Sequence, residues 1–369
     1  MKKLLMTAST YSHISSFHLP YLREFHRLGW ETHVACSKIP NEHPDYIDSL
    51  IDLPFEKKIF ALKNFKAAKE IRDWIKKENY NLIITHTSLA AFFTRLGIKG
   101  IKRNIRVINV VHGYLFDDNT HLLKKMVFLA AERLTAPETD LILTMNEWDY
   151  NTAKKYQLGK KVRKIPGIGV DFSRFDVATE ADGKKLREDL NIPKDAFVLI
   201  YPAEFSVRKS QSVLIKAMSL LPRRVVLVLP GSGMLLKECK TLSLQMKLGK
   251  RVLFPGYITN LAPWYHMADA AVTSSRIEGL PFNVMEAIYC GLPVVASAVK
   301  GNIDLVNNDN KGLLYPYGDF KACSLQIKRI MDNETMQDFR KDRDNEFARA
   351  YGIDHVLPEV LEQYVAITN

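Results

Sequence analysis

The chain has few cysteines, and none of them has the spacing of a zinc site or a redox pair. Its 369 residues include only Cys36, Cys239, Cys290 and Cys323, with no C-x-x-C. This scarcity argues against a disulfide-stapled secreted domain and fits a reduced, cytosolic protein. A G-x-G-x-x-G turn after the first apolar run is also missing, which disfavours a dinucleotide-dependent oxidoreductase.

Long apolar runs are missing as well. The uncharged stretches 4–22 and 252–268 are broken by Ser, Thr and His or by two prolines and an Asn, so neither is expected to cross a bilayer. The positive start Met1-Lys2-Lys3 is followed by a short apolar run. We interpret that run as a buried first strand and not as a secretory signal. The expected location is therefore cytoplasmic.

Positive charge is present in excess, but only in the first half of the chain. Residues 1–175 hold 28 Lys and Arg against 18 Asp and Glu, a net +10, whereas residues 176–369 hold 24 against 23, a net +1. A one-sided positive field favours an anionic partner such as a phospholipid surface, a lipid phosphate or a nucleic acid.

Short apolar runs alternate with helical patterns along the whole chain, which predicts an α/β protein with doubly wound parallel sheets. The expected strands are 3–8, 32–37, 82–85, 107–111 and 141–145, then 197–203, 225–229, 252–254, 270–273, 293–296 and 312–315. A Pro- and Gly-containing segment, 165–175, divides the two sets. We therefore predict Rossmann-like domains over 1–175 and 176–353, facing across a cleft, and a C-terminal helix over 354–369.

The strongest chemical signal follows the expected strand 270–273. The segment Glu278-Gly279-Leu280-Pro281 forms a turn, and a helix is expected to start near Asn283 and to carry Glu286 about one turn in. Free N–H groups at a helix start can bind a diphosphate. A carboxylate on either side can accept hydrogen bonds from sugar hydroxyls. A glutamate pair alone would more readily be a dipole-balancing residue and a solvated acid.

The residues around the pair make the signal specific. The run from Glu278 to Ser297 resembles the E-x7-E signature of the family-4 retaining glycosyltransferases, which have the GT-B fold. The resemblance extends over most of the chain and implies that the C-terminal helix crosses back to the first domain. It also implies that Glu278 holds the donor sugar and Glu286 the ribose. The other donor-binding residues that it implies are Gly279, Leu280, Pro281, Phe282, Asn283, Val284, Gly231, Tyr257 and Ile258.

The expected diphosphate clamp departs from the family pattern. Lys209 matches the position of the family's lysine, which neutralises the leaving diphosphate, but Glu204 stands where many members have an arginine. Arg208 is the nearest candidate for the second cation. A solvated surface charge is the alternative for Lys209.

In the first domain, the resemblance points to His112. The sequence His112-Gly113 ends an expected strand and is similar to the family's His-Gly, where the imidazole lies beside the reacting sugar carbon. A structural histidine is the alternative, and for His86, also at a strand end, the two interpretations stay equally open. The first loop, 9–18, resembles a subgroup that builds capsule or exopolysaccharide repeat units. There His13, Ser15 and Ser16 are candidate acceptor contacts.

Two segments of the first half mix basic and apolar residues, 55–74 and 92–106. Amphipathic helices packed on a sheet would explain them, and so would a face that lies on anionic lipid. The net charge favours some membrane contact, so the protein is expected to be peripheral on the inner face of the plasma membrane.

The resemblance implies a metal-independent, retaining hexosyltransferase with no cofactor. Its expected donor is a UDP-linked hexose or N-acetylhexosamine, and its expected acceptor is a saccharide linked to undecaprenyl diphosphate, in exopolysaccharide or capsule biosynthesis. The D-x-D motif at Asp342-Arg343-Asp344 is interpreted as a solvated helix face and not as a metal site. A nucleotide-sugar 2-epimerase of the same fold and a basic nucleic-acid-binding protein are the alternatives, although no nucleic-acid-binding motif is found and nucleic acid is not an expected partner.

Overall fold

A computed structural model describes residues 1–56, 61–101, 104–306, 311–332 and 345–368. The D-x-D motif lies outside these residues, as do parts of the two basic–apolar segments. The chain forms two compact units, Met1–Gly169 with Asp354–Asn369 and Val170–Ile353. The first division therefore lies at Gly169, whereas the sequence analysis put it after Phe175.

Unit 1 contains a seven-stranded parallel sheet among the described residues, in the order β3-β2-β1-β4-β5-β6-β7. The strands are β1 Lys3–Thr10, β2 Glu31–Ser37, β3 Ser49–Asp52, β4 Leu82–His86, β5 Arg106–Val111, β6 Leu141–Thr144 and β7 Lys161–Lys164. The helices are α1 Tyr11–Phe17, α2 Leu19–Arg27, α3 Leu62–Lys77, α4 Ser88–Ile98, α5 Leu122–Thr135, α6 Glu147–Lys155 and α16 Ile353–Ala366, with a short 3-10 turn at Ala136–Glu138.

Unit 2 repeats this architecture with six parallel strands in the order β10-β9-β8-β11-β12-β13. The strands are β8 Phe197–Ile200, β9 Val225–Pro230, β10 Val252–Gly256, β11 Ala270–Thr273, β12 Val294–Ser297 and β13 Gly312–Tyr315. The helices are α7 Glu180–Asp189, α8 Gln211–Met218, α9 Leu236–Gln245, α10 Ala262–Met267, α11 Phe282–Tyr289, α12 Asn302–Leu305, α13 Phe320–Asp332 and α15 Asn345–Tyr351, with 3-10 turns at Ser173–Phe175 and Gly249–Arg251.

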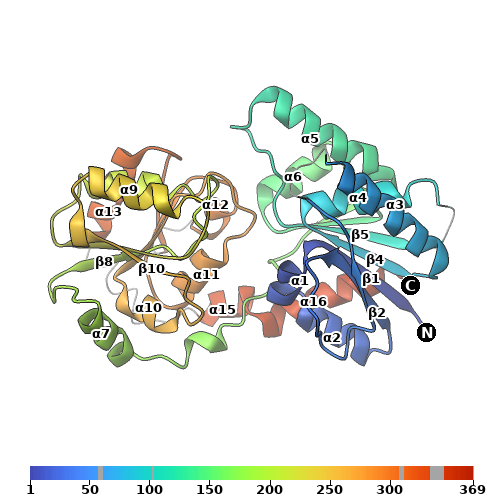
Figure 1. Ribbon diagram of the computed structural model, residues 1–369, viewed down its shortest axis with the longest axis horizontal. Coiled ribbons are helices and arrows are strands. Elements are labelled where there is room, and N and C mark those ends of the chain that lie inside the picture. The colour runs from blue at the N-terminus through green and yellow to red at the C-terminus, as the bar shows by residue number, and fades with distance from the viewer. Residues whose placement is uncertain (57–60, 102–103, 307–310, 333–344, 369) are drawn as a thin grey trace. The chain divides into compact units, whose positions relative to one another are not determined.

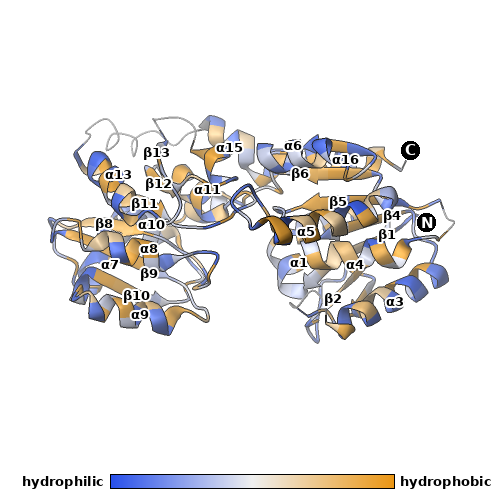
Figure 2. Ribbon diagram, turned by 90° about the horizontal axis from the view of Figure 1, so that it is seen from above, coloured by the Kyte–Doolittle hydropathy of each residue, from blue (hydrophilic) through white to orange (hydrophobic). Residues whose placement is uncertain are grey.

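The predicted fold class is thus confirmed: each unit is a doubly wound parallel sheet between helices (Figure 1). The inner strands are buried on both faces, as their continuous apolar runs predict, and Figure 2 colours them largely hydrophobic. Strand order reverses between β1 and β4 in unit 1 and between β8 and β11 in unit 2. Ligands of such sheets bind beside the carboxyl ends of the strands at the reversal.

The C-terminal helix belongs to unit 1, as predicted. Tyr364 on α16 is fully buried, and its ring centroid lies 5.7 Å from that of Tyr21 and 6.2 Å from that of Phe25, both on α2. The Tyr21 hydroxyl donates a 3.0 Å hydrogen bond to the Ile168 carbonyl. Residues more than three hundred positions apart therefore share one core.

The predicted first loop was wrong in part, because helix α1 occupies most of it. β1 continues to Thr10, and α1 follows at once, anchored by the fully buried Ile14. The sequence analysis also missed the edge strands β3 and β7, and it extended the strand at Phe197 beyond Ile200. Edge strands are short and partly solvated, so they lack the apolar run that marks an inner strand. No described helix is long and apolar enough to cross a membrane.

Candidate active site

In unit 2, the loop after β11 and the start of α11 carry the two glutamates of the E-x7-E segment. Pro281 precedes the first helical residue in an extended conformation, and its carbonyl accepts a 3.2 Å hydrogen bond from the Val284 N–H. The side-chain amide of Asn283 donates to the Pro202 carbonyl at 3.3 Å. This contact joins the start of α11 to the segment that follows β8, across the strand-order reversal.

Glu278 is buried and forms ion pairs with two consecutive cations. Its Oε1 accepts a hydrogen bond from Nζ of Lys209 at 2.6 Å, and its Oε2 accepts one from Arg208 at 3.0 Å. The lysine segment is itself fixed, because the Ser274 hydroxyl lies 2.9 Å from the carbonyl oxygens of Lys209 and Ser210. The strand-order reversal thus brings together all three charged residues that the sequence analysis singled out here.

The pKa values of Glu278 and Lys209 depend on each other and on Arg208. Burial alone would raise the pKa of Glu278, but Lys209 and Arg208 outweigh it and hold that pKa below its ordinary value. Burial lowers the pKa of Lys209, against the opposing effect of Glu278. Glu204, which stands in the place of the family's arginine, is exposed, and its carbonyl accepts a 2.8 Å hydrogen bond from Gln211.

Glu286 lies in the second turn of α11 and is also buried. It accepts hydrogen bonds from the Tyr265 hydroxyl, at 2.9 Å, and from the Arg174 guanidinium. Burial raises the pKa of Glu286, while Arg174 and Tyr265 act in the opposite direction. Arg174 stacks on the Phe175 ring, 4.7 Å from its centroid. The sequence analysis missed Arg174 because it treated 165–175 as a linker; a basic residue next to an aromatic one was the available signal.

A pocket of about 460 Å³ adjoins this glutamate's partner. It is lined by Arg174, Pro202, Ala203, Glu204, Pro230, Gly231, Ser232, Tyr257, Ile258, Thr259 and Leu261. Gly231 has a φ of +150°, and a Cβ there would lie 2.1 Å from the Ala203 carbonyl oxygen. The turn after β9 therefore requires glycine for close backbone packing. Three candidates from two loops, Gly231 after β9 and Tyr257 and Ile258 after β10, line the same pocket.

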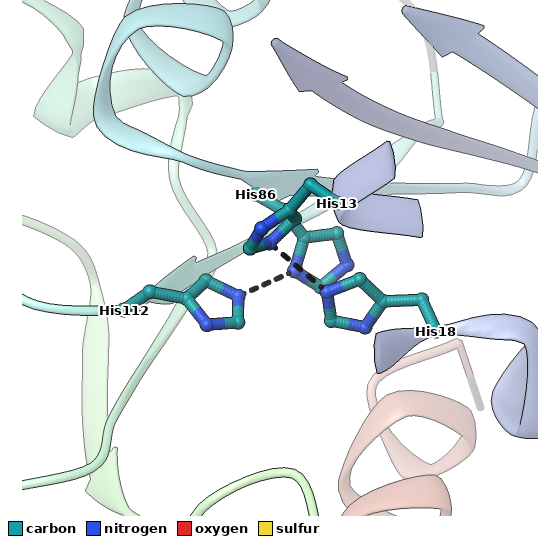
Figure 3. A group of neighbouring side chains, drawn as sticks. All are labelled: His13, His18, His86 and His112. Carbon is teal, nitrogen blue, oxygen red and sulfur yellow. Dashed lines mark hydrogen bonds between the residues drawn. The ribbon is translucent and has the colours of Figure 1, made fainter. Parts of the chain in front are cut away.

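In unit 1, four histidines meet near the ends of the central strands (Figure 3). His13 lies on α1, His86 ends β4, and His112 follows β5. The fourth, His18, lies between α1 and α2 and had no predicted role. Nδ1 of His86 lies 3.1 Å from Nε2 of His112, and the Nε2 atoms of His13 and His18 lie 3.3 Å apart.

Burial lowers the pKa of all four imidazoles, that of His13 to about 4, and neighbouring imidazoles lower the other three further. The cluster is therefore neutral at physiological pH. Nδ1 of His18 and Nε2 of His86 are buried without a hydrogen-bond partner in the part of the chain described.

Each of the four rings offers a nitrogen atom, and these atoms all lie within 4.8 Å of one another, close enough to ligate one metal ion. However, the rings of His18 and His86 are stacked, with centroids 3.7 Å apart and planes inclined by 27°. An ion bound to both nitrogens in good geometry would have to lie in both ring planes. This stacking disfavours a single ion bound by both His18 and His86.

The two serines predicted to lie on the acceptor side are on the same short helix as His13. Ser15 and Ser16 are exposed, and the Ser15 hydroxyl donates to the Ser12 carbonyl at 3.2 Å. Neither serine is a member of the histidine cluster. The structure therefore groups His13, His86 and His112 and leaves both serines at the surface.

Comparisons with known proteins agree with this architecture. Residues 21–174 match the model described as Glycosyltransferase Family 4, and residues 182–346 match that of Glycosyl transferases group 1. EpsD of Bacillus subtilis (strain 168), which is named a glycosyltransferase, is 30% identical over 89% of this chain and 87% of its own length. The Escherichia coli UDP-Gal:alpha-D-GlcNAc-diphosphoundecaprenol alpha-1,3-galactosyltransferase is 24% identical over 87% of this chain and 85% of its own.

Solved structures share the fold at lower identity. Anabaena Alr3699/HepE in complex with UDP and glucose has a TM-score of 0.79 at 16% identity, covering 99% of this chain and all of that one. The sucrose-phosphate synthase of Thermosynechococcus elongatus has a TM-score of 0.81 at 21% identity, covering 100% and 99%. The two family models together with the similarity to EpsD lead to one assignment: the chain belongs to the family-4 glycosyltransferases of the GT-B fold.

Proposed function

We propose that this glycosyltransferase moves a hexose or N-acetylhexosamine from a UDP-sugar to a saccharide linked to undecaprenyl diphosphate, with retention of configuration, in exopolysaccharide or capsule biosynthesis. One observation carries the proposal. Two buried glutamates flank the start of α11, one paired with Lys209 and Arg208 and the other with Arg174, which lines a pocket of nucleotide size. The name of the Escherichia coli relative, which describes a diphosphoundecaprenol-linked substrate, supports the acceptor class.

Predicted residues from several loops of unit 2 form the proposed donor site. Glu286 accepts hydrogen bonds from the ribose, and the base lies in the pocket against Tyr257 and Ile258. Backbone N–H groups of Phe282, Asn283 and Val284 meet the diphosphate at the helix start. Gly279, Leu280 and Pro281 shape the loop that brings Glu278 to the sugar. The cations keep Glu278 ionised, so that it can accept hydrogen bonds from sugar hydroxyls.

In the proposed reaction the acceptor hydroxyl attacks the anomeric carbon from the side of the leaving diphosphate. The bond from that carbon to the diphosphate breaks, the new glycosidic bond forms, and the acceptor's proton passes to the leaving phosphate. Lys209, assisted by Arg208, stabilises the charge that develops on the diphosphate. His112 acts beside the sugar as a neutral imidazole, with His13, Ser15 and Ser16 on the acceptor side. We propose that no metal or other cofactor takes part.

The proposed setting is the inner face of the plasma membrane, with the protein held there peripherally. The net charge of +10 in residues 1–175 supports attraction to anionic lipid. Undecaprenyl-linked substrates reside in the bilayer, so an enzyme that acts on them gains from staying at its surface. Nucleic acid is not a partner in this proposal.

The direct test is to incubate the enzyme with UDP-hexoses and with a synthetic saccharide diphosphate lipid, with and without EDTA, and to follow the products by mass spectrometry. We expect one sugar to be transferred, at the same rate with and without EDTA. NMR of the product should show that the new linkage has the anomeric configuration of the donor. Reactions without acceptor are the control, because rapid formation of an epimer there would favour the 2-epimerase instead. An inverted product would contradict the retaining mechanism.

A further inference from the structure

Helix α5 presents an unusual outer surface. Leu122 and Leu123 are each 67% exposed, and Met126 and Val127, one turn further on, are 57% and 51% exposed. Leu134 continues this apolar face near the end of the helix. Figure 1 shows α5 on the outside of unit 1 beside α4, and Figure 2 colours much of it hydrophobic. Neighbouring exposed apolar side chains of this kind are characteristic of an interaction site.

The opposite side of the same helix lines a large pocket. Phe128 and Ala131 of α5 form part of the wall of a cavity of about 660 Å³ within unit 1. Most of the remaining wall is apolar, with Leu89, Phe92, Phe93, Tyr114 and Phe116 among its members. The volume lies within the range of about 300–1,000 Å³ that is usual for small-molecule sites. An apolar cavity thus lies directly behind an apolar surface.

The pocket also has a polar part, formed by residues at or near the ends of β1, β2 and β4. Ser9, Ser37 and Thr87 contribute hydroxyl groups, and Lys38 contributes a positive charge. The hydroxyls of Ser9 and Thr87 lie 2.7 Å apart. The Ser37 hydroxyl already donates to the Ser9 carbonyl at 2.6 Å, so Lys38 and the remaining hydroxyl proton of the Ser9–Thr87 pair are the donors for an anionic head group.

The two acids of the pocket wall are already neutralised by cations. Glu132 is paired at 2.8 Å with the fully buried Arg95, and Glu56 is paired at 2.7 Å with Lys63. On α5 itself, Lys124 is exposed, and its Nζ lies 5.7 Å from the centroid of the Phe128 ring. The charges around the pocket therefore favour an anion with a long apolar part.

We propose that this pocket binds the hydrocarbon chain of a phosphate-headed lipid, the acceptor lipid of the proposed function, and that the apolar face of α5 lies on the bilayer from which the lipid enters. This inference rests on the proposed function for the identity of the lipid. The net charge of +10 in residues 1–175 favours an anionic phospholipid surface over a second copy of this basic chain. The cavity behind the apolar face can bind a lipid chain, whereas a flat protein partner would leave it unfilled.

The test uses dodecyl phosphate below its micellar concentration, with butyl phosphate as the short-chain comparison, and calorimetric titration of the whole protein. Ala131→Trp fills the pocket, while Ala130→Trp adds the same bulk to the exposed side of the helix. We expect Ala131→Trp to weaken dodecyl phosphate binding about tenfold or more, equivalent to about 1.4 kcal/mol, and Ala130→Trp to leave it nearly unchanged. Leu89→Trp is a second filling variant if Ala131→Trp does not fold. Equal binding by wild type and filled variants, or of the short and long phosphates, would overturn the proposal.

A second arm tests the surface of α5. Leu122→Ser with Met126→Ser should reduce co-sedimentation with phosphatidylglycerol–phosphatidylethanolamine vesicles, whereas Leu244→Ser with Leu325→Ser, exposed leucines of unit 2, should not. Equal co-sedimentation of the two double variants would refute the membrane role. So would a concentration-dependent dimer of the wild type that only the α5 variant abolishes. Dodecyl phosphate binding without any sugar transfer would mean that the proposed function has failed while the pocket assignment stands. If the filled variants transfer sugar at the same rate to short- and long-chain acceptors, the pocket assignment has failed while the proposed function stands.

Discussion

Nζ of Lys209 lies 2.6 Å from Oε1 of Glu278, and this pair joins the loops that follow β8 and β11. The side chains are 12% and 5% exposed. An ion pair removed from water to this degree is costly unless its geometry is good and its charges serve a purpose. The lysine can support the fold through Glu278, and it can also stabilise charge on a departing diphosphate.

The first prediction separates these two uses. We expect Lys209→Ala to lower kcat by about 10²–10³-fold, the usual loss when one charge-stabilising donor is removed, while UDP still binds. Lys216→Ala, an exposed lysine of the same unit, is the matched control. Steady-state kinetics and calorimetric titration with UDP give both quantities. Wild-type turnover by Lys209→Ala would leave the lysine with a structural role only.

The second prediction concerns Glu286 and Arg174. Burial raises the pKa of Glu286 and Arg174 lowers it, so removal of the cation should raise it further. A carboxylate accepts hydrogen bonds from a ribose best when ionised, and UDP affinity should therefore fall as pH drops through this pKa. We expect Arg174→Gln to shift the midpoint of that fall to higher pH, and Glu286→Gln to weaken binding at all pH values. The measurement is the UDP dissociation constant between pH 5 and 8.

Two exposed residues of unit 2 provide controls for this experiment, Arg223→Gln and Glu238→Gln. Both should match wild type in affinity and in midpoint. An unchanged midpoint in Arg174→Gln would show that the guanidinium does not control the ionisation of Glu286. Unchanged affinity in Glu286→Gln would refute the ribose role.

The third prediction is that the histidine cluster makes unit 1 acid-sensitive. The pKa of His13 falls to about 4 in the folded protein, compared with about 6.5 when unfolded. The unfolded chain then binds more protons, so the free energy of unfolding decreases as pH falls from about 6.5 toward 4. Urea unfolding at pH 7 and pH 5 should show a smaller decrease for His13→Gln than for wild type. His43→Gln, at an exposed position, should behave as wild type does. An equal decrease in the free energy of unfolding between pH 7 and pH 5 in all three proteins would contradict the prediction.

The fourth prediction tests the glycine turn after β9. A Cβ on residue 231 would lie 2.1 Å from the Ala203 carbonyl oxygen, so Gly231→Ala must displace the backbone beside the pocket. We expect a loss of about 1–3 kcal/mol in the free energy of unfolding, together with weaker UDP binding. Gly249→Ala, where a Cβ meets open space at positive φ, controls for the conformational cost alone. Equal effects of the two substitutions would show that close packing is not the reason for glycine at 231.

Much of the fold could be predicted from the sequence because inner parallel strands carry continuous apolar runs, as Leu82–Thr85 and Val225–Leu229 do. β3 and β7 were missed because an edge strand such as Lys161–Lys164 remains partly solvated and polar. α1 was missed because a helix of seven residues with one buried side chain, Ile14, has no clear periodicity.

The candidate site was predictable where one short segment holds it and not where distant segments meet. Glu278 and Glu286 belong to a single motif, so local reasoning located both. Arg174 lies more than a hundred residues from its partner Glu286. Likewise, the outward apolar face of α5 could not be told from a core face, because periodicity does not say which side of a helix the sheet covers.

The return of α16 to unit 1 has a consequence for synthesis. Unit 2 is one uninterrupted stretch, Val170–Ile353, whereas unit 1 requires the last residues, Asp354–Asn369, to complete its core. On the ribosome the second unit can therefore finish folding first, and the earlier one has to wait with Tyr21 and Phe25 uncovered until Tyr364 emerges. A chain that lacks Tyr364 and the rest of α16 would thus keep unit 2 folded but leave the core of unit 1 open to chaperones and proteases.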